Sequence, residues 1–555
     1  MRSDVEISNR TDLENIVDIA KKLRLDENEI EPLGDFKAKL SFDSMRDHLE
    51  DKFGNLILVT AMTPTRKGEG KTTVTIGLTQ ALRKIGKNAT LGIREPSIGP
   101  TMGMKGGAAG GGYSQVLPME DINLHFTGDL HAVGISHNLI SAMINNRMHR
   151  GNGLNIDPRN VVWPRVMDMN DRALRNVVVG LGGSSDGMPN ETSFGITASS
   201  EVMAVLCLSE NILDLKERLS RITVAYNFDD KPIRISDIGG SGAMATLLKH
   251  AIKPNLVQTI EGSPAFVHGG PFANIAHGTS SIISTKIGMG LSDYFVTEAG
   301  FGSDLGAEKF FDIVCREGDI EPDATVLVVS ARALKRQGGV PSDQLDKEDV
   351  GSLKEGFENL EKHIENIRMF GLPVVIAINR FPSDTDEELK SIKKFCQKKE
   401  ISFSEVKVYQ EGGDGGIDLA EKVVELCDNQ TDFDFLYSLE ISPRKKISKI
   451  AEEIYGAEEV VFTQNAVRDL ERIEKVNMDD LPICMSKTHQ SLSDDPDLLG
   501  RPRGFELKIK EIRINSGAGF LVPSAGEIRT MPGLPERSAA EDIDIDEGGN
   551  VSGLF

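Results

Sequence analysis

A short apolar run followed by helical periodicity stands near residue 60. Residues 56–60 (LILVT) form an apolar run of strand length. After a polar segment, apolar residues recur at Val74, Leu78, Leu82 and Ile85, which is the spacing of one helix face, and Gly86 suits a helix end. The pattern predicts a strand, a loop and a helix in that order.

Further apolar runs of strand length follow along the chain, and helical stretches separate them. They lie at 89–93, 176–179, 222–225, 256–260, 324–330 and 373–378. Strands that alternate with helices are typical of a parallel sheet, because a parallel connection is long enough to hold a helix. The pattern therefore predicts an α/β fold with a mostly parallel, doubly wound sheet and additional smaller α/β domains.

Domain boundaries follow from changes in composition. A charged and polar stretch between 340 and 360 interrupts the alternation of strands and helices. We expect one domain at 1–360 with helices at its N-terminal end, a second α/β domain at 361–455 and a C-terminal domain at 456–555. A chain of 555 residues is long enough for several domains.

The segment between the first strand and its helix, residues 63–73 (TPTRKGEGKTT), has the composition of a phosphate-binding loop, or P-loop. Glycine allows backbone N–H groups to turn toward phosphate oxygens, and the start of a helix favours the same anion. Lys71 would reach the β- and γ-phosphates of ATP, and the Thr72 hydroxyl would bind Mg²⁺. The predicted ATP-binding residues are Thr65, Arg66, Lys67, Gly68, Glu69, Gly70, Lys71 and Thr72.

The loop departs from the standard pattern G-x-x-x-x-G-K-[ST] at one position, where Thr65 replaces the first glycine. It is similar to a variant loop in which a second lysine, here Lys67, precedes the glycines. A turn rich in glycine and lysine can also be only a turn. The strand before it and the amphipathic helix after it favour nucleotide binding and a P-loop NTPase-like fold.

Charge and cysteine usage narrow the class of protein. Lys and Arg number 63 against 85 Asp and Glu, a net charge of −22 that argues against nucleic acid and anionic membranes as partners. No apolar stretch reaches the roughly 18 residues that span a bilayer, and the first residues lack an apolar signal region. Five scattered cysteines without C-x-x-C pairs indicate free thiols. We expect a cytoplasmic protein.

A second glycine-rich segment covers residues 99–113 (GPTMGMKGGAAGGGY). So many glycines disfavour a regular helix or strand, because each raises the entropy lost on folding. A flexible linker is one interpretation, but the near absence of serine and the presence of Lys105 and Tyr113 favour a loop at a binding site. Just before it, the predicted strand 89–93 ends at Arg94 and Glu95, on the sheet edge where such folds bind ligands.

Three short sequence motifs, taken together, resemble those of the formate–tetrahydrofolate ligase family, also called formyltetrahydrofolate synthetases. They are REPS at 94–97, GMKGGAAGGGY at 103–113 and ARALKRQGG at 331–339. The chain length and the order of the strings resemble that family along essentially the whole chain. The resemblance implies a ligase of one-carbon metabolism that joins formate to tetrahydrofolate with ATP and gives 10-formyltetrahydrofolate, ADP and phosphate through formyl phosphate.

The resemblance also implies roles for single residues. Lys71 and Arg94 would be catalytic and surround the transferred phosphoryl group with positive charge, and a guanidinium can grip both a carboxylate and a phosphate. The family's folate-binding aromatic positions correspond to Phe381 and Tyr409, with Phe301 as a weaker candidate nearby. Tyr409 stands where the family usually has Trp.

Partners and cofactors follow from the same resemblance. It implies a homotetramer, Mg²⁺ with the ATP, and activation by potassium or ammonium, and it makes the domain at 361–455 a contributor to the folate site. A P-loop switch or partitioning-type ATPase is the alternative from another class, because the loop alone does not exclude it. Such a protein would need no second small-molecule pocket.

Four histidines lie between residues 125 and 149, together with Asp129. Their spacing matches no common zinc pattern, and no cysteine joins them. We expect these histidines to be structural or hydrogen-bonding groups, and Asp129 is a weaker candidate for a contact near Mg²⁺ or phosphate-binding groups.

Overall fold

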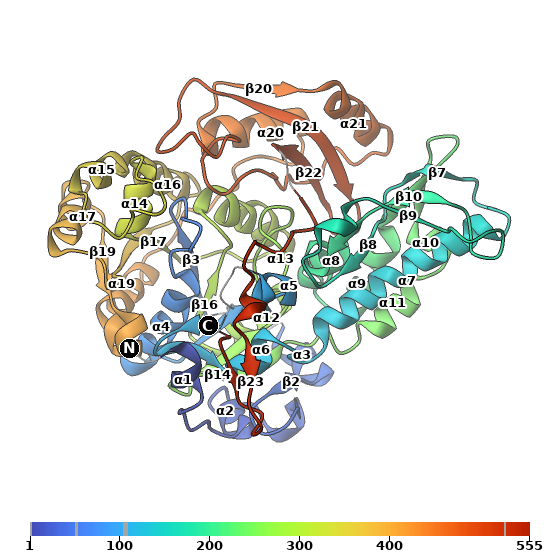
Figure 1. Ribbon diagram of the computed structural model, residues 1–555. Helices are drawn as coiled ribbons and strands as arrows, with labels where there is room; N and C mark the ends of the chain where they lie inside the picture. The colour runs from blue at the N-terminus through green and yellow to red at the C-terminus, as the bar shows by residue number, and fades with distance from the viewer. Residues whose placement is uncertain (1–2, 50–53, 104–108, 527–528, 555) are drawn as a thin grey trace.

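The computed structural model describes residues 3–49, 54–103, 109–526 and 529–554. At its centre lies a 12-stranded sheet in the order β1-β2-β14-β15-β4-β16-β3-β17-β18-β19 (Figure 1). In addition, β6 pairs with β14, and β5 pairs with β6. The strands from β15 to β19 in this order are parallel to one another. They are β15 (Pro264–Val267), β4 (Ala89–Ile93), β16 (Tyr294–Glu298), β3 (Asn55–Ala61), β17 (Ala324–Val329), β18 (Val374–Asn379) and β19 (Phe403–Val406).

The remaining strands of this sheet are antiparallel to their neighbours. They are β1 (Ile30–Pro32), β2 (Ala38–Leu40), β5 (Gly110–Gly111), β6 (Ser114–Leu117) and β14 (Asn255–Thr259). Helices α1 (Asp4–Ser8), α2 (Ile16–Lys21) and α3 (Phe42–His48) precede β3. The N-terminal segment before β3 therefore contributes the edge strand β1 and its neighbour β2 as well as the expected helices.

The predicted strand at 56–60 is buried on both of its faces. In β3, Leu56 and Leu58 belong to one hydrophobic cluster and Ile57 and Val59 to another. The second cluster takes in residues of α4 (Lys71–Lys84) and α19 (Ile417–Cys427), and the first takes in residues of α12 (Ile282–Leu291) and α16 (Phe357–Met369). A strand covered on both faces is apolar throughout, which is why this run lacks alternation. The expected α/β architecture around a large, mostly parallel sheet is confirmed.

Three of the predicted parallel strands are antiparallel instead. The run at 176–179 becomes β9 (Val177–Val179), which pairs with β10 (Asn190–Thr192). The run at 222–225 becomes β12 (Thr223–Asn227), which pairs with β13 (Pro232–Arg234) and β7 (Ile156–Val161). The run at 256–260 becomes β14. The turns after β12 and β14 are too short for the crossover that a parallel pair requires.

Two further bodies pack against the sheet. A helical lobe, drawn in teal and green in Figure 1, surrounds the small sheet β7-β12-β13 and contains α7 (Asp129–His149), α8 (Glu201–Leu208), α9 (Ile212–Arg221), α10 (Ile235–Ile238) and α11 (Ser241–Leu247). The C-terminal unit, drawn in orange, contains β20 (Glu459–Phe462), α21 (Gln464–Lys475), β21 (Glu506–Asn515) and β22 (Phe520–Ala525). The lobe lies inside the predicted first domain.

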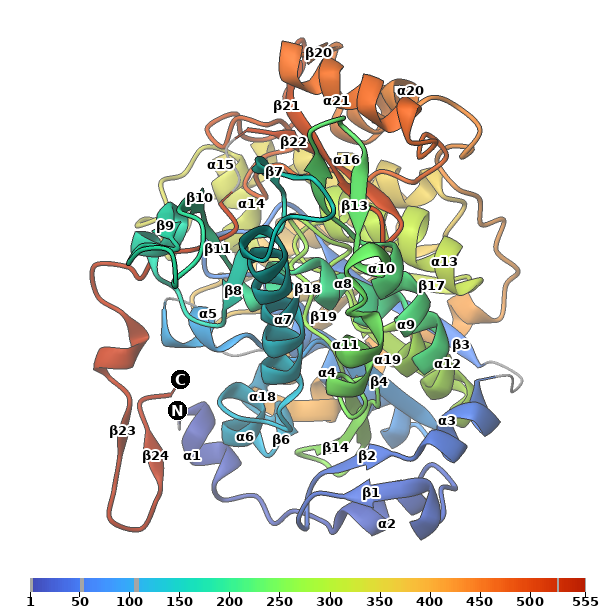
Figure 2. The ribbon, with the colours of Figure 1, turned by 90° about the vertical axis from the view of Figure 1, so that its right-hand side faces the viewer.

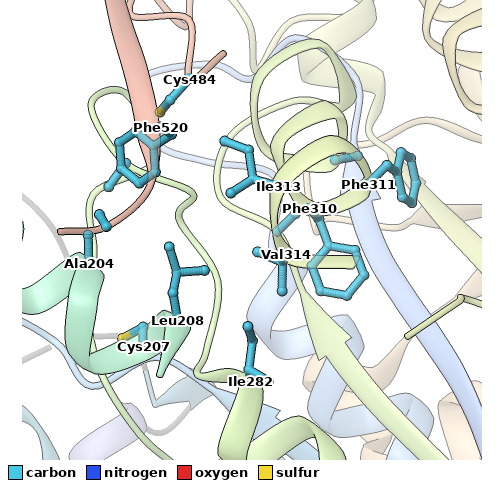
Figure 3. Packing of buried hydrophobic residues seen from close by; sticks show 14 of the residues in the cluster. Ala204, Cys207, Leu208, Ile282, Phe310, Phe311, Ile313, Val314, Cys484 and Phe520 are labelled. Carbon is cyan, nitrogen blue, oxygen red and sulfur yellow. The ribbon is translucent and has the colours of Figure 1, made fainter. Parts of the chain in front are cut away.

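The sheet, the helical lobe and the C-terminal unit share one hydrophobic core. Figure 3 shows Cys484 and Phe520 of the C-terminal unit close to Ile313 of the π-helical segment η5 (Phe310–Cys315) and to Leu208 of α8. All four side chains are buried in one cluster. Moreover, β18 and β19 continue the sheet beyond β17, so the composition change at 340–360 does not separate two sheets.

The chain ends in a short hairpin of β23 (Asp544–Ile545) and β24 (Val551–Ser552). Its acidic residues are largely exposed. The following Leu554 is 1% exposed and belongs to the same buried cluster as Val5 of α1, and Figure 2 shows the C-terminus beside that helix. No helix in the described ranges is long and apolar enough to cross a membrane. All five cysteines are free.

Helices α14 (Ala331–Gln337), α15 (Val350–Glu355) and α17 (Asp386–Lys398) cover one end of the sheet. A salt bridge of 2.9 Å joins Lys335 of α14 to Glu388 of α17, and neither side chain is exposed. The Lys335 ammonium also donates to the Lys347 carbonyl at 2.7 Å, and Glu388 accepts from the Asp349 N–H at 3.1 Å. The pair therefore fixes the polar 340–360 segment between two helices.

This pair generates a stability prediction. Glu388→Gln leaves the Lys335 ammonium buried without its counter-charge, which lowers the free energy of unfolding by about 3 kcal/mol. Glu387→Gln is the matched control on the same helix, because Glu387 pairs with Lys390 at a site where both side chains are more than half exposed, and its loss is worth less than about 1 kcal/mol. Urea unfolding of the variants measures both. Equal losses of unfolding free energy in the two single variants would contradict the prediction. The double variant Lys335→Met with Glu388→Leu replaces the buried pair by apolar side chains and should recover much of the stability.

Candidate active site

The loops that follow β3, β4, β16, β17 and β18 lie at one edge of the sheet, because these strands are parallel. Residues 62–70 connect β3 to α4, here called the β3–α4 loop. Gly68 and Gly70 have φ angles of +78° and +77°, values that side chains rarely adopt. Lys71 and Thr72 are the first two residues of α4. The predicted order of strand, glycine loop and helix is present.

Glu69 connects this loop to the neighbouring strands. Its carboxylate accepts the Thr65 N–H at 2.6 Å and the hydroxyl of Ser330, the residue after β17. The side chain of Asn379, at the end of β18, donates to the Glu69 carbonyl at 2.9 Å. Thr65 occupies the position at which the standard loop has glycine, and here the Glu69 carboxylate satisfies its N–H. The residue that departs from the standard loop, Thr65, is thus held by a hydrogen bond within the loop itself.

Positive charge gathers at the start of α4. Burial lowers the pKa of Lys71; the charges of Glu298 and Glu69 raise it, and that of Arg94 lowers it further. Burial also lowers the pKa of Arg94, and Glu298 acts in the opposite direction. Glu298 ends β16 and is 4% exposed. One buried carboxylate therefore lies within electrostatic reach of both cations.

The same carboxylate holds Thr72. The Thr72 hydroxyl lies 2.9 and 3.0 Å from the two oxygens of Glu298 and donates to them. The hydroxyl predicted to bind a metal is thus paired with a carboxylate that sequence reasoning missed. The two residues are 226 positions apart, so no local pattern could reveal the pair.

The loop after β15, residues 268–281, packs against Arg94. This loop was not identified from the sequence as part of the site. Arg94 donates from Nη1 to the Pro271 carbonyl at 3.2 Å, and its buried Nε has no partner among the described residues. A Cβ on Gly300 would lie 2.5 Å from the Ala273 Cβ and 3.3 Å from Arg94 Nη1, so only glycine fits there. The string HGGPFANIAHG at 268–278, dense in glycine and histidine after an apolar strand, was the available signal.

His277 of this loop is fully buried, and neither ring nitrogen has a partner in the described part of the chain. Burial lowers its pKa to about 3, and the charges of Arg94 and Lys309 act in the same direction. The imidazole is therefore neutral at physiological pH. By contrast, His268 in the same loop is bonded to the Ser281 hydroxyl and the Ala251 carbonyl.

Phe381, a predicted folate contact, lies beside the β3–α4 loop. The guanidinium carbon of Arg332 is 3.7 Å from its ring centroid. Arg332 also donates to the Gly68 carbonyl at 3.3 Å. One face of the Phe381 ring is therefore covered by a cation, a contact that favours a fixed ring orientation.

Tyr409, the second predicted folate contact, packs on the end of the glycine-rich segment. Its hydroxyl donates to Asp4 at 2.8 Å, and its carbonyl accepts the Tyr113 N–H at 2.9 Å. A Cβ on Gly112 would lie 2.0 Å from that carbonyl oxygen, which explains glycine there. Burial and the neighbouring Asp4 raise the Tyr409 pKa to about 12. Lys105 and the rest of 104–108 lie outside the described residues.

Phe301 follows β16 between Gly300 and Gly302. Its φ of +60° is in the left-handed region, which an aromatic residue rarely adopts. Its ring stacks on His489 of the C-terminal unit with a centroid distance of 4.4 Å and an interplanar angle of 15°. In the described ranges, Phe301, Phe381 and Tyr409 do not contact one another's rings.

Two of the other polar residues singled out in the sequence have partners within the fold. His137 stacks on Trp163 at 4.0 Å and bonds the Ser200 hydroxyl and the Pro164 carbonyl, both at 2.8 Å. Asp129 forms a buried pair of 2.9 Å with Lys39. No group of three or more His, Cys, Asp or Glu side chains among the described residues is arranged to hold a metal. His137 thus has the expected structural role.

A cavity of about 360 Å³ lies away from this edge, between the helical lobe and the C-terminal unit. Trp163, Tyr226 and Arg472 help to line it. The Arg472 guanidinium sits over the Tyr226 ring at 4.4 Å. The residues predicted to act on ATP and formate are not part of its lining.

Comparison with known proteins gives a family match along nearly the whole chain. The family described as formate–tetrahydrofolate ligase matches residues 2–555. A solved structure of translation elongation factor SelB from Methanococcus maripaludis, in complex with the GTP analogue GppNHp, is 14% identical, with a TM-score of 0.16. That match covers 27% of this chain and 28% of the other chain, and at this score it carries no argument about fold.

The β3–α4 loop generates a prediction about glycine. A Cβ on Gly70 would lie 2.5 Å from the Asn379 side-chain nitrogen, so Gly70→Ala should displace Asn379 from Glu69 and lower Mg-ATP affinity at least about tenfold. Gly86→Ala is the matched control, because Gly86 has a similar φ of +81° with no atom within 4 Å of a Cβ. Both changes introduce left-handed strain of about 1 kcal/mol. Titration calorimetry with Mg-ATP separates them, and equal affinities would contradict the role of Gly70.

Proposed function

Because the chain belongs to the formate–tetrahydrofolate ligase family, we propose that it uses ATP to join formate to N10 of tetrahydrofolate through formyl phosphate. A formate oxygen attacks the γ-phosphorus of ATP, the bond to the bridging oxygen breaks, and ADP leaves. N10 then attacks the formyl carbon, inorganic phosphate leaves, and the amine proton is lost. The products are 10-formyltetrahydrofolate, ADP and phosphate.

The observation that carries the proposal is the pair of cations, Lys71 and Arg94, at the edge of the sheet beside the start of α4. Phosphoryl transfer depends mainly on positioning and on charge that stabilises the transferred group. Lys71, at the start of α4, would meet the β- and γ-phosphates, with the N–H groups of a P-loop NTPase-like loop around them. Arg94 would face formate and the transferred phosphoryl group, because its planar guanidinium matches both.

The oxygen atoms of Thr72 and Glu298 fit Mg²⁺, which prefers hard oxygen ligands. Their closest approach is 2.9 Å, and Glu298 is otherwise buried. Thr72 would hold the ion directly, and Glu298 would accept a hydrogen bond from the ion's water shell. Bound there, Mg²⁺ would neutralise phosphate charge during transfer.

Residues 268–281 would shield the reacting groups from water. Formyl phosphate is an acyl phosphate, which water can hydrolyse before N10 attacks it. The Pro271 carbonyl accepts a hydrogen bond from the Arg94 guanidinium, and the loop that carries Pro271 is mostly buried. A closed surface around Arg94 would favour attack by the amine over hydrolysis.

The folate would lie on aromatic faces at the same edge of the sheet. Phe381, which lies beside the β3–α4 loop, and Phe301, which follows Gly300 near Arg94, would flank the place where N10 meets the formyl group. Tyr409 would contribute a smaller ring than the family's usual Trp, held by its bond to Asp4. In this proposal, residues 361–455 contribute to the folate site through Phe381 and Tyr409. Activation by potassium or ammonium, a homotetramer and a cytoplasmic location stay predictions.

Omission of each substrate in turn tests the proposed reaction. Formation of 10-formyltetrahydrofolate and ADP should require ATP, formate and tetrahydrofolate together. Lys71→Ala should remove at least about 99% of turnover, because loss of a positioned transition-state charge slows such steps by roughly 10²–10³-fold. ADP release that is independent of formate and folate would instead support the switch or partitioning ATPase.

Arg94→Gln tests the second cation. We expect kcat to fall by about 10²-fold with little change in Mg-ATP affinity, since Arg94 is proposed to stabilise transfer to formate. Arg94→Lys should restore part of the rate. The matched control is Arg83→Gln on α4, where the guanidinium donates to the Ala89 carbonyl away from the site. Weaker nucleotide binding with normal kcat at saturating ATP would place Arg94 in the nucleotide site instead.

A further inference from the structure

Phe301 occupies a strained backbone position in the loop after β16, between Gly300 and Gly302. A Cβ on its neighbour Gly300 would lie 3.3 Å from Arg94 Nη1, and a Cβ on Gly302 would lie 3.4 Å from the Met62 carbonyl of the β3–α4 loop. Glycine would adopt its φ of +60° without strain, yet this position carries an aromatic side chain. Backbone strain of this kind is concentrated at functional sites. We therefore expect that the aromatic ring of Phe301 has a role that a glycine could not fill.

The stacking partner of Phe301 comes from the C-terminal unit. His489 lies in a segment anchored on two sides. The Ser486 N–H donates to the Pro523 carbonyl of β22 at 2.9 Å. Lys487 forms a buried pair of 2.8 Å with Asp304, three residues after Phe301. The segment therefore reaches the β16 loop with little freedom.

The stack contributes little to holding the two bodies together. The shared core around Phe520, Cys484 and Ile313 already buries their interface (Figure 3), and the Lys487–Asp304 pair adds a polar contact. The Phe301 and His489 side chains are both only half-buried. The stack lies at the rim of an interface that other residues already bury. It is better explained by a role in ligand binding, in which a ring face contacts the ligand.

We propose that His489 is a positioning residue that holds Phe301 as one wall of the folate site. This inference rests on the proposed function. The imidazole covers one face of the Phe301 ring at 4.4 Å, so the other face can receive a flat heteroaromatic ring. The ligand is the reduced pterin and aminobenzoyl portion of tetrahydrofolate, whose N10 must reach the formyl group near Arg94. The C-terminal unit thereby takes part in substrate binding.

His489→Ala tests the proposal through a split between kinetic constants. We expect the KM for tetrahydrofolate to rise roughly two- to tenfold, the range of one aromatic stack, with kcat and the KM for ATP unchanged. His489→Phe keeps a flat ring and should retain a KM near that of the unmodified enzyme. Phe395→Ala is the matched control, because Phe395 stacks on Phe357 at 4.4 Å and 20° on the helices α16 and α17.

The possible outcomes separate the inference from the proposed function. Calorimetric binding of tetrahydrofolate and its formylation by the unmodified enzyme establish the reaction. If neither occurs, the proposed function fails. If both occur and His489→Ala has an unchanged KM for tetrahydrofolate, or if Phe395→Ala raises that KM equally, the positioning role fails. A rise in the KM values of all substrates together with a lower thermal midpoint would also overturn it, because that is the signature of a structural contact.

Discussion

The buried carboxylate of Glu298 is the group on which the candidate site depends. Lys71 and Arg94 are both partly buried and lie close enough for the charge of Arg94 to lower the pKa of Lys71. Glu298 opposes the effect of burial on the pKa of both cations. It also accepts the Thr72 hydroxyl, which fixes the start of α4 relative to β16. Buried cations are costly without such a partner. A site rich in positive charge can therefore persist before any anionic substrate arrives.

The sequence predicted those helices and strands whose position is determined by the pattern of apolar residues within the element itself. The strand at 56–60, the strand at 89–93 and the helix ending near Gly86 were found because their apolar patterns need no distant partner. Strand direction at 222–225 and 256–260 was wrong, since turn length and pairing decide direction rather than the run itself. The domain boundary near 360 was predicted from composition and stays a prediction; β17 and β18, which lie on either side of it in the sequence, pair in one sheet.

The candidate site was predictable in part. Lys71 and Thr72 stand out because loop and helix are contiguous, and the resemblance supplied Arg94 and the aromatic residues, whose roles stay predictions. Glu298 and Asn379 could not be found in this way. Glu69 was predicted as part of the loop, but its contacts with Ser330 and Asn379 were not, because they join residues 261 and 310 positions apart. Such contacts exist only once parallel strands bring their ends together.

The common core of the sheet, the helical lobe and the C-terminal unit limits how this chain can be divided. Phe310 and Val314 face the same apolar cluster as Phe520, so a fragment without the C-terminal unit would expose this surface to water. Exposed patches of that kind promote aggregation. Fragments cut near residue 455 should therefore be poor candidates for separate production. During synthesis on the ribosome, the core of the sheet must also wait for β22, among the last strands to emerge, before its burial is complete.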